Sequence, residues 1–390
     1  MPDLPDVLFA VATPGLEEVT AGELRDLRCK GVRAQPGGVA FRGDLTTALR
    51  TNFWLRTATR ILLRVDAFGA RRLRDLRAGA AAVPWRRLLP ATGSIRVQAT
   101  CHKSSIYHSG AAAQRVAEAV GAALGWAVEP AEASRFRVGA ARPDTPEQHL
   151  LVRLDHDRAQ LSLDTSGERL HRRGYRLETA KAPLRETLAA ALLRLAGWRG
   201  ATPLVDPLCG AGTLVIEAAL VAARIPPGLG RSFALETWPG FDPEARGRLL
   251  DEARARRRPL PAPVRGSDRD AGAVDAARRN AERAGVGAEL SFTQAPLSAL
   301  TLTPPPGLVV CNPPYGRRLG RAGPLRNLYA TLGARLAAAP PGWQLALVTA
   351  APDLAHATGL PLQRLAPPVP HGGLTAHLLL GKPRDATDVP

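Results

Sequence analysis

The chain has 390 residues, 45% of them hydrophobic, and a formal net charge of +17 at pH 7. No apolar run reaches the roughly 18 residues that span a bilayer, and the four cysteines are dispersed without a CxxC pair. These features exclude a membrane span, a zinc site and a disulfide framework from the prediction. The length suggests two or three domains, and the excess of cations predicts a polyanionic partner, most simply a nucleic acid. The acidic, proline-broken start does not resemble a signal peptide, so we expect a cytoplasmic protein with reduced thiols and no metal.

The first 170 residues alternate short apolar strands with helical stretches. The pattern predicts helices over residues 16–28, 44–52 and 109–124, the second of them with Asp44 as N-cap. It predicts strands over residues 7–11, 38–42, 61–65, 94–99, 150–154 and 159–164. Basic side chains are dense in this part, at Arg71, Arg72, Arg74, Arg77, Arg86 and Arg87. They indicate either a solvated α+β surface or a platform that contacts RNA, and the net charge favours the platform.

From residue 182 onward strands and helices alternate in a way typical of a doubly wound parallel sheet. Helices are predicted over residues 184–196, 213–224, 272–284 and 324–339. Strands are predicted over residues 203–205, 264–267, 289–292, 307–311 and 345–348, and a closing hairpin over residues 362–365 and 376–380. An extra stretch, residues 225–263, interrupts the alternation. We place the boundary between the two halves near Gly167.

The motif Asn312-Pro313-Pro314-Tyr315 directly follows an apolar strand. Such a strand delivers its last side chains to the carboxyl edge of the sheet, where open α/β sheets bind ligands. The two prolines fix φ and leave carbonyl groups free to accept hydrogen bonds. The Asn312 amide oxygen and the Pro313 carbonyl can together accept both protons of a flat amino group, and Tyr315 can stack on the ring that carries it. The motif therefore predicts a grip for an exocyclic amine.

A glycine-rich turn follows the strand at residues 203–205. It contains Asp206, Pro207, Cys209, Gly210, Gly212 and Thr213 and opens a predicted helix. The glycines allow close approach of a ligand to the backbone, but GxGxxG spacing and a phosphate-loop lysine are both absent. A carboxylate at Asp206 repels a pyrophosphate and suits a ligand with an ammonium group, such as the methionine part of S-adenosylmethionine. Taken alone, this sequence is also compatible with a tight turn that binds no ligand.

Asp268 ends the next predicted strand. An acid in this position reaches ribose hydroxyls in nucleoside-binding sheets, although residues 225–263 make the separation from the glycine turn longer than usual. Asp268 and Asp270 also fit helix N-caps. Both roles are compatible, with Asp270 as the cap.

The glycine turn, Asp268 and the Asn-Pro-Pro-Tyr motif together resemble the class I S-adenosylmethionine-dependent methyltransferases that act on amino groups. Residues 9–17, 171–176 and 182–189 extend this resemblance over nearly the whole chain, to the THUMP-containing RNA guanine-N2 methyltransferases. The stretch 225–263 is more similar to the large-subunit ribosomal RNA branch than to the tRNA branch. The resemblance implies a ferredoxin-like region (1–60), a THUMP RNA-binding domain (61–167) and a Rossmann-like methyltransferase domain (168–390) with a seven-stranded, mostly parallel sheet.

The resemblance also implies roles for single residues. Catalysis falls to Asn312, Pro313, Pro314 and Tyr315, and S-adenosylmethionine binding to Asp206, Pro207, Cys209, Gly210, Gly212, Thr213, Asp268, Gln294 and Asn312. RNA binding falls to Arg172, Arg173, Tyr175, Arg176, Lys181 and Arg185. The family has an acid after the third strand, where this chain offers only Gln294. The implied protein is a monomer that methylates guanine N2 in 23S ribosomal RNA or tRNA. Methylation of adenine N6 or of a glutamine amide, and a non-catalytic RNA-binding assembly factor, remain alternatives.

Overall fold

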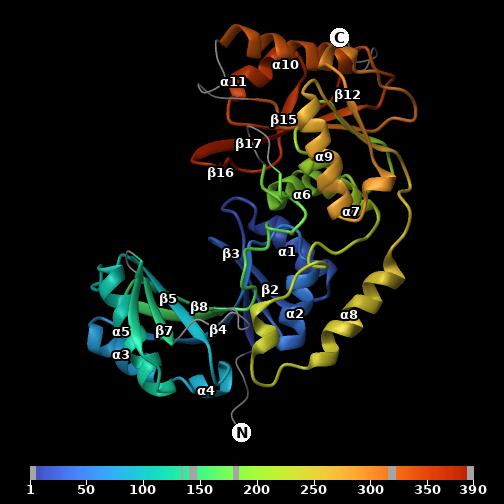
Figure 1. Cartoon of the computed structure of the whole chain (residues 1–390). Helices are drawn as coiled ribbons and strands as arrows, with labels where there is room; N and C mark the ends of the chain where they lie inside the picture. Colours follow the sequence, from blue (N-terminus) through green and yellow to red (C-terminus); the bar gives the residue numbers. More distant parts are fainter. Residues whose placement is uncertain (1–5, 133–134, 140–146, 179–183, 315–321, 384–390) are drawn as a thin grey trace.

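The computed structural model describes residues 6–132, 135–139, 147–178, 184–314 and 322–383 and contains two large sheets (Figure 1). One sheet is built by the N-terminal half of the chain and the other by the C-terminal half. Within these described ranges, no helix is long and apolar enough to cross a membrane.

Nine strands form the first sheet, in the order β2-β3-β1-β4-β9-β8-β5-β7-β6. They are β1 (Val7–Val11), β2 (Lys30–Gln35), β3 (Gly38–Arg42), β4 (Arg60–Gly69), β5 (Ser94–His102), β6 (Val128–Glu132), β7 (Arg135–Gly139), β8 (Gln148–Asp155) and β9 (Arg158–Asp164). The ten-residue strand β4 pairs with β1 at its start and with β9 over most of its length. The boundary predicted after residue 60 therefore falls inside a continuous sheet.

Two groups of helices cover this sheet. The helices α1 (Glu17–Asp26) and α2 (Leu45–Trp54) pack beside β2, β3 and β4, and Asp44 caps α2 as predicted. The helices α3 (Leu73–Ala82), α4 (Trp85–Leu88) and α5 (Ser109–Leu124) pack with one another and with β5 and β7, in a lobe that projects away from the rest (Figure 1). One apolar core runs through both parts of the sheet.

The second sheet has the order β12-β11-β10-β13-β14-β17-β15, and β16 pairs with β17. Its strands are β10 (Leu204–Asp206), β11 (Val264–Asp268), β12 (Ser291–Gln294), β13 (Leu308–Cys311), β14 (Gln344–Thr349), β15 (Leu362–Arg364), β16 (Val369–His371) and β17 (Leu374–Gly381). The first five are parallel, and β17 is antiparallel to both β14 and β15. The sheet is mostly parallel as predicted, with β16 as an eighth strand where seven were predicted.

Helices flank the second sheet. They are α6 (Glu186–Leu195), α7 (Thr213–Ala222), α9 (Ala271–Arg283), α10 (Ala322–Ala337) and α11 (Pro352–Ala355), with short 3-10 turns η2 (Gly287–Glu289), η3 (Leu297–Ala299) and η5 (His356–Thr358). Along the chain, the parallel strands follow the order β10, β11, β12, β13, β14, whereas β10 lies in the middle of the sheet between β11 and β13. The sheet therefore reverses its direction of winding at β10, which is where such folds bind ligands.

The stretch 225–263, for which no element was predicted, folds as η1 (Ala234–Thr237) and α8 (Pro243–Arg256) and packs on the N-terminal half. In Figure 1, α8 lies alongside α2. Trp238 and Leu249 belong to the core of the first sheet, and the Trp238 indole donates a hydrogen bond of 2.7 Å to Gln148. A bidentate pair joins Arg50 of α2 to Glu252 of α8. The stretch thus fastens the two halves together.

Several other elements were missed. They are β2, β6, β7, β16, the helix α3 and the one-turn helices α4 and α11. In α3 only Leu76 and Ala80 are buried, so the apolar pattern is too sparse to predict a helix among the basic residues. The strands β6 and β16 are short and each contains a proline, which weakens a strand prediction, although each pairs with the next strand along the chain. The strand β7 also pairs with β5, which lies farther away in the sequence.

Candidate active site

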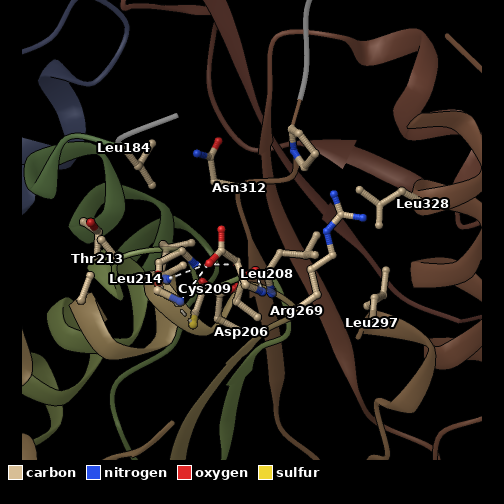
Figure 2. Close-up of a pocket in the computed structure, with 18 of the residues that line it drawn as sticks. Leu184, Asp206, Leu208, Cys209, Thr213, Leu214, Arg269, Leu297, Asn312 and Leu328 are labelled. Carbon is tan, nitrogen blue, oxygen red and sulfur yellow. Dashed lines mark hydrogen bonds between the residues drawn. The ribbon is translucent and has the colours of Figure 1, made fainter. Parts of the chain in front are cut away.

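Three neighbouring parallel strands bring the predicted site together. Asp206 ends β10, Asp268 ends β11, and Asn312 directly follows β13. Because β11 and β13 pair with β10 on its two sides, these three side chains meet at one edge of the sheet. They line a cavity of about 600 Å³, a size usual for a small-molecule site. Figure 2 shows Asn312 facing the same space as Asp206 and Cys209.

The glycine turn forms one wall of the cavity. Gly210 and Gly212 have φ of 53° and 83°, a region that residues with a Cβ rarely adopt. The Cys209 N–H donates to the Ser267 carbonyl at 2.9 Å, and the Gly210 N–H donates to the Asp268 carboxylate at 3.0 Å. These two bonds tie the turn to the end of β11. Cys209, Gly210 and Thr213 line the cavity, as predicted for cofactor binding.

Asp206 is a strongly perturbed acid of the site. Its carboxyl is 1% exposed and accepts a hydrogen bond of 3.0 Å from the Leu208 N–H. Burial raises its pKa to about 8, and the nearby Asp268 adds to the increase. A buried carboxyl gains most from a cationic partner, because an opposite charge favours the ionised form. The cavity is therefore suited to a ligand that carries an ammonium group beside Asp206.

The strand β13 is buried throughout and delivers Asn312 and Pro314 to the cavity. Tyr315 and Lys181 lie outside the described residues. Asp270 accepts hydrogen bonds from Gly272 and Ala273 and caps α9, as predicted. It also lines the cavity.

Four predicted residues are not among the side chains that line the cavity in the described part of the chain: Pro207, Gly212, Gln294 and Pro313. Gly212 acts through the backbone, because it is the N-cap of α7, where a Cβ would lie 3.0 Å from the Ala277 Cβ. Gln294 is exposed on β12, and its amide donates to the Arg269 carbonyl at 3.3 Å. The structure therefore gives Gln294 no place in the cavity.

Sequence reasoning missed several lining residues. They are mostly apolar: Leu184, Leu208, Leu214, Leu297, Leu325 and Leu328, together with Arg176 and Arg269. No local signal distinguishes these leucines from core residues. Asn280 of α9 was also not predicted. Its buried side-chain amide donates a hydrogen bond to the Ala211 carbonyl at 3.0 Å and fixes the glycine turn from the side of α9.

Comparison with known proteins assigns this site to a family. The RMKL-like methyltransferase domain matches residues 173–364, and the RlmL ferredoxin-like domain matches residues 7–62. The chain belongs to the RMKL-like methyltransferase family. Its fold and cofactor class are those of S-adenosylmethionine-dependent methyltransferases.

Relatives of this RMKL-like methyltransferase cover most of its length. It is 43% identical over 382 residues to the ribosomal RNA large subunit methyltransferase K/L of Syntrophotalea carbinolica, covering 93% of this chain and 52% of that protein. The chain thus spans about half the length of the curated relatives it matches. The crystal structure of the methyltransferase SMU.472 complexed with SAH is 28% identical with a TM-score of 0.83, covering 98% of this chain and 99% of that one. A predicted N6-adenine-specific DNA methylase from Listeria monocytogenes is 30% identical with a TM-score of 0.82, covering 96% of this chain and 95% of that one.

The residues predicted to bind RNA divide into surface and interior positions in this RMKL-like methyltransferase. Arg172 is exposed and Arg185 is partly exposed. Arg173 and Tyr175 are instead buried around Glu217 of α7, at 3.5 Å and 3.1 Å from its carboxylate. Burial leaves both side chains without a surface for RNA, which corrects the prediction for them. Arg176 is also turned inward and lines the cavity.

The network around Glu217 reaches the N-terminal half of this methyltransferase. The Arg173 guanidinium donates to the Arg56 carbonyl, and the Arg56 guanidinium donates to the Leu220 and Ile225 carbonyls at the end of α7. The same helix α7 begins at the glycine turn. The packing of the first sheet therefore supports one wall of the cavity.

One cluster of metal-binding residue types lies at the tip of the projecting lobe. His102 and His156 each place Nδ1 near one oxygen of Asp155, at 3.0 Å and 2.8 Å. The parallel pairing of β5 with β8 sets His102 opposite Asp155. Arg153 pairs with the other oxygen of Asp155 at 3.0 Å, and its charge opposes the binding of a cation there.

Proposed function

We propose that this chain transfers a methyl group from S-adenosylmethionine to the exocyclic N2 amine of a guanine in RNA, with 23S ribosomal RNA as the favoured substrate. The observation that carries the proposal is the meeting of Asp206, Asp268 and Asn312 at one cavity beside the glycine turn. The ribosomal RNA methyltransferases that are 36–43% identical to this chain support RNA as the substrate.

The described residues fit the proposed cofactor. When bound, S-adenosylmethionine supplies a methyl group on a positively charged sulfur. Asp206 accepts hydrogen bonds from the ammonium group, which also favours its ionised form. Asp268, fixed by the N–H groups of Gly210 and Asp270, keeps lone pairs for ribose hydroxyls. Leu208 and Leu297 add apolar surface to the cavity for an adenine ring.

Catalysis in this proposal consists mainly of positioning. The Asn312 side-chain oxygen and the Pro313 carbonyl would accept hydrogen bonds from the two amine N–H groups, which aims the nitrogen lone pair at the methyl group. The N–C bond would form as the S–C bond breaks, leaving S-adenosylhomocysteine, and the methylated nitrogen would lose its proton to solvent. Holding two reactants in line supplies a large share of such a rate enhancement. Tyr315 stacks on the base, and a paired guanine must first leave its helix at a cost of a few kcal/mol.

The charge of the chain supports RNA as the proposed partner. A net charge of +17 favours a polyanion, and exposed basic residues such as Arg172 and Arg77 lie outside the cavity. We propose that the protein acts as a monomer and that methyl transfer uses no metal.

The test is methylation in vitro followed by nucleoside analysis. The full chain is incubated with methyl-labelled S-adenosylmethionine and ribosomal RNA from cells that lack it, with tRNA from the same cells in parallel. Labelled N2-methylguanosine in the 23S RNA supports the proposal. Label only in tRNA contradicts the ribosomal assignment, and binding of RNA with no label in either pool supports a non-catalytic assembly factor.

A second candidate is methylation of adenine N6. The 30% identical Listeria monocytogenes structure, described as a predicted N6-adenine-specific DNA methylase, favours it, and the Asn-Pro-Pro-Tyr motif suits the adenine amine equally. The same nucleoside analysis separates the two candidates, because N6-methyladenosine and N2-methylguanosine differ in chromatographic mobility. A labelled protein instead of labelled RNA would indicate a glutamine amide as the acceptor.

A further inference from the structure

The methionine end of the proposed cofactor carries two charges. Its ammonium group has a partner in Asp206, but its carboxylate needs a cation, because a buried carboxylate without one is strongly disfavoured. Among the described residues that line the cavity, two are cationic: Arg176 and Arg269. Under the proposed function, on which this inference rests, the positions of the two arginines in the cavity distinguish them.

Arg176 lies on the side of the cavity where the methionine end belongs. Its Nη1 donates to the carbonyl of Leu184, and in Figure 2 Leu184 and Thr213 lie on one side of Asp206. Thr213 is the first residue of α7, so the free N–H groups of that helix start point to the same region. A carboxylate bound here meets both the helix start and a guanidinium.

The guanidinium of Arg176 is held before any ligand binds. Its Nε lies 3.1 Å from the Glu186 carboxylate, and the Arg176 side chain is 16% exposed while that of Glu186 is 2% exposed. Glu186 lies in the first turn of α6, and burial raises its pKa to about 7. The two described contacts occupy Nε and Nη1, and the planar fork of an arginine has further N–H donors for a carboxylate.

Arg269 is less suited to this role. It is exposed, it directly follows Asp268 at the end of β11, and in Figure 2 it lies on the opposite side of Asp206 from Leu184. A cation beside Asp268 is near the ribose and base of the proposed ligand rather than its methionine end.

We propose that Arg176 binds the carboxylate of the methionine part of S-adenosylmethionine, with Asp206 opposite it as the partner of the ammonium group. This role replaces the RNA contact predicted for Arg176. It assigns Arg176 to the cofactor site, although this residue precedes Asp206 of the glycine turn by some 30 residues.

The test compares two ligands that differ only in the carboxylate. Calorimetry measures the affinity of wild type, Arg176→Met and Arg269→Met for S-adenosylhomocysteine and for its decarboxylated form, S-adenosyl-3-thiopropylamine. Since a charged hydrogen bond contributes about 1.5–3 kcal/mol, Arg176→Met is expected to lose about 10- to 100-fold for S-adenosylhomocysteine. Its affinity for the decarboxylated ligand stays within about 3-fold. Arg269→Met is expected to change both affinities by the same factor.

A double variant, Arg176→Met with Glu186→Met, guards against misfolding because it leaves no buried carboxylate without its partner. It should show the same selective loss. Equal loss of both ligands in the Arg176 variants, or selective loss in Arg269→Met, would overturn the inference while leaving the cofactor proposal intact. If wild type binds neither ligand, the proposed function itself fails.

Discussion

At the scale of single residues, the burial of Asp206 suits the cavity to a cationic ligand but also makes the folded protein less stable as the pH rises. The fold buries its carboxyl at the end of β10, and the pKa rises from 3.8 to about 8. Because the folded state holds this proton more tightly than the unfolded chain, the group's contribution to stability is complete below about pH 4. It is lost as the pH rises through about 8. Near neutral pH, the buried Asp206 carboxyl therefore lowers the stability of the ligand-free protein, and a bound cationic ligand would offset this cost.

Asp206→Asn tests this conflict. The amide keeps the shape of the side chain but does not titrate. Between about pH 5 and about pH 8.5, we expect the wild-type free energy of unfolding to fall relative to that of Asp206→Asn, by on the order of 3 kcal/mol. Urea unfolding without cofactor measures this difference. The variant should also bind S-adenosylhomocysteine more weakly. A stability difference that does not change with pH would contradict the account.

We propose that Asn312 contributes more to turnover than to cofactor binding. Asn312→Ala removes the side-chain oxygen that aligns the amine, so we expect turnover to fall by about 100-fold, the scale of a misplaced reactant. The affinity for S-adenosylhomocysteine should stay within about 3-fold, because Asp206 and the glycine turn are unchanged. Single-turnover kinetics and calorimetry measure the two quantities. A loss of cofactor affinity as large as the loss of turnover would contradict the assigned role.

At the scale of elements, the stretch 225–263 is a segment whose structure differs greatly from what the sequence predicted. The sequence marks it as an interruption of the βα alternation, and the structure shows a strap that carries Trp238 into the core of the first sheet. Trp238 is 4% exposed, and Gln148 of β8 accepts its indole hydrogen bond. The stability of the N-terminal half should therefore depend on a segment that follows the glycine turn in sequence.

Trp238→Ala should lower the free energy of unfolding by about 3–5 kcal/mol, the usual cost of deleting a buried aromatic side chain. The matched control is Arg254→Ala on α8, whose side chain is 76% exposed and whose loss should matter by less than about 0.5 kcal/mol. Urea unfolding followed by fluorescence and circular dichroism compares them. Equal stability of the two variants would show that the strap does not support the first sheet.

At the scale of the whole molecule, charge and cavity separate two kinds of binding. RNA binding by a chain of net charge +17 should release counterions, so its affinity should fall linearly on a logarithmic salt scale. If about six phosphates are neutralised, the loss between about 50 and 200 mM salt is about 1000-fold. Cofactor binding in a partly enclosed cavity should change little, because buried pairs are weakly screened. Filter binding and calorimetry on the same sample test both. RNA affinity that does not depend on salt would argue against a phosphate-contacting surface.

The local pattern predicted most of the C-terminal half because each feature there is short-range. An apolar strand, a turn rich in glycine or proline and a helix follow one another within about 20 residues. That Asp206, Asp268 and Asn312 end neighbouring strands follows from the order of the strands in the sheet, which the structure shows. The N-terminal half was predicted less fully, since β2 and β6 contain few apolar residues and lack a clear strand pattern, although each pairs with the next strand along the chain.

Periodicity and turn chemistry are local properties, so they were enough to predict the sheet type, the glycine turn and the position of the Asn-Pro-Pro-Tyr motif. Which arginines are exposed and which face inward became visible in the tertiary structure, since burial depends on segments far apart in the chain. Arg173 and Tyr175 pack against Glu217, 42 or more residues away. Arg176 enters the cavity through contacts with Leu184 and Glu186. In the motif at residues 171–176 the letters alone indicate a basic surface, whereas the fold buries Arg173 and Tyr175 and makes Arg176 part of the cavity wall.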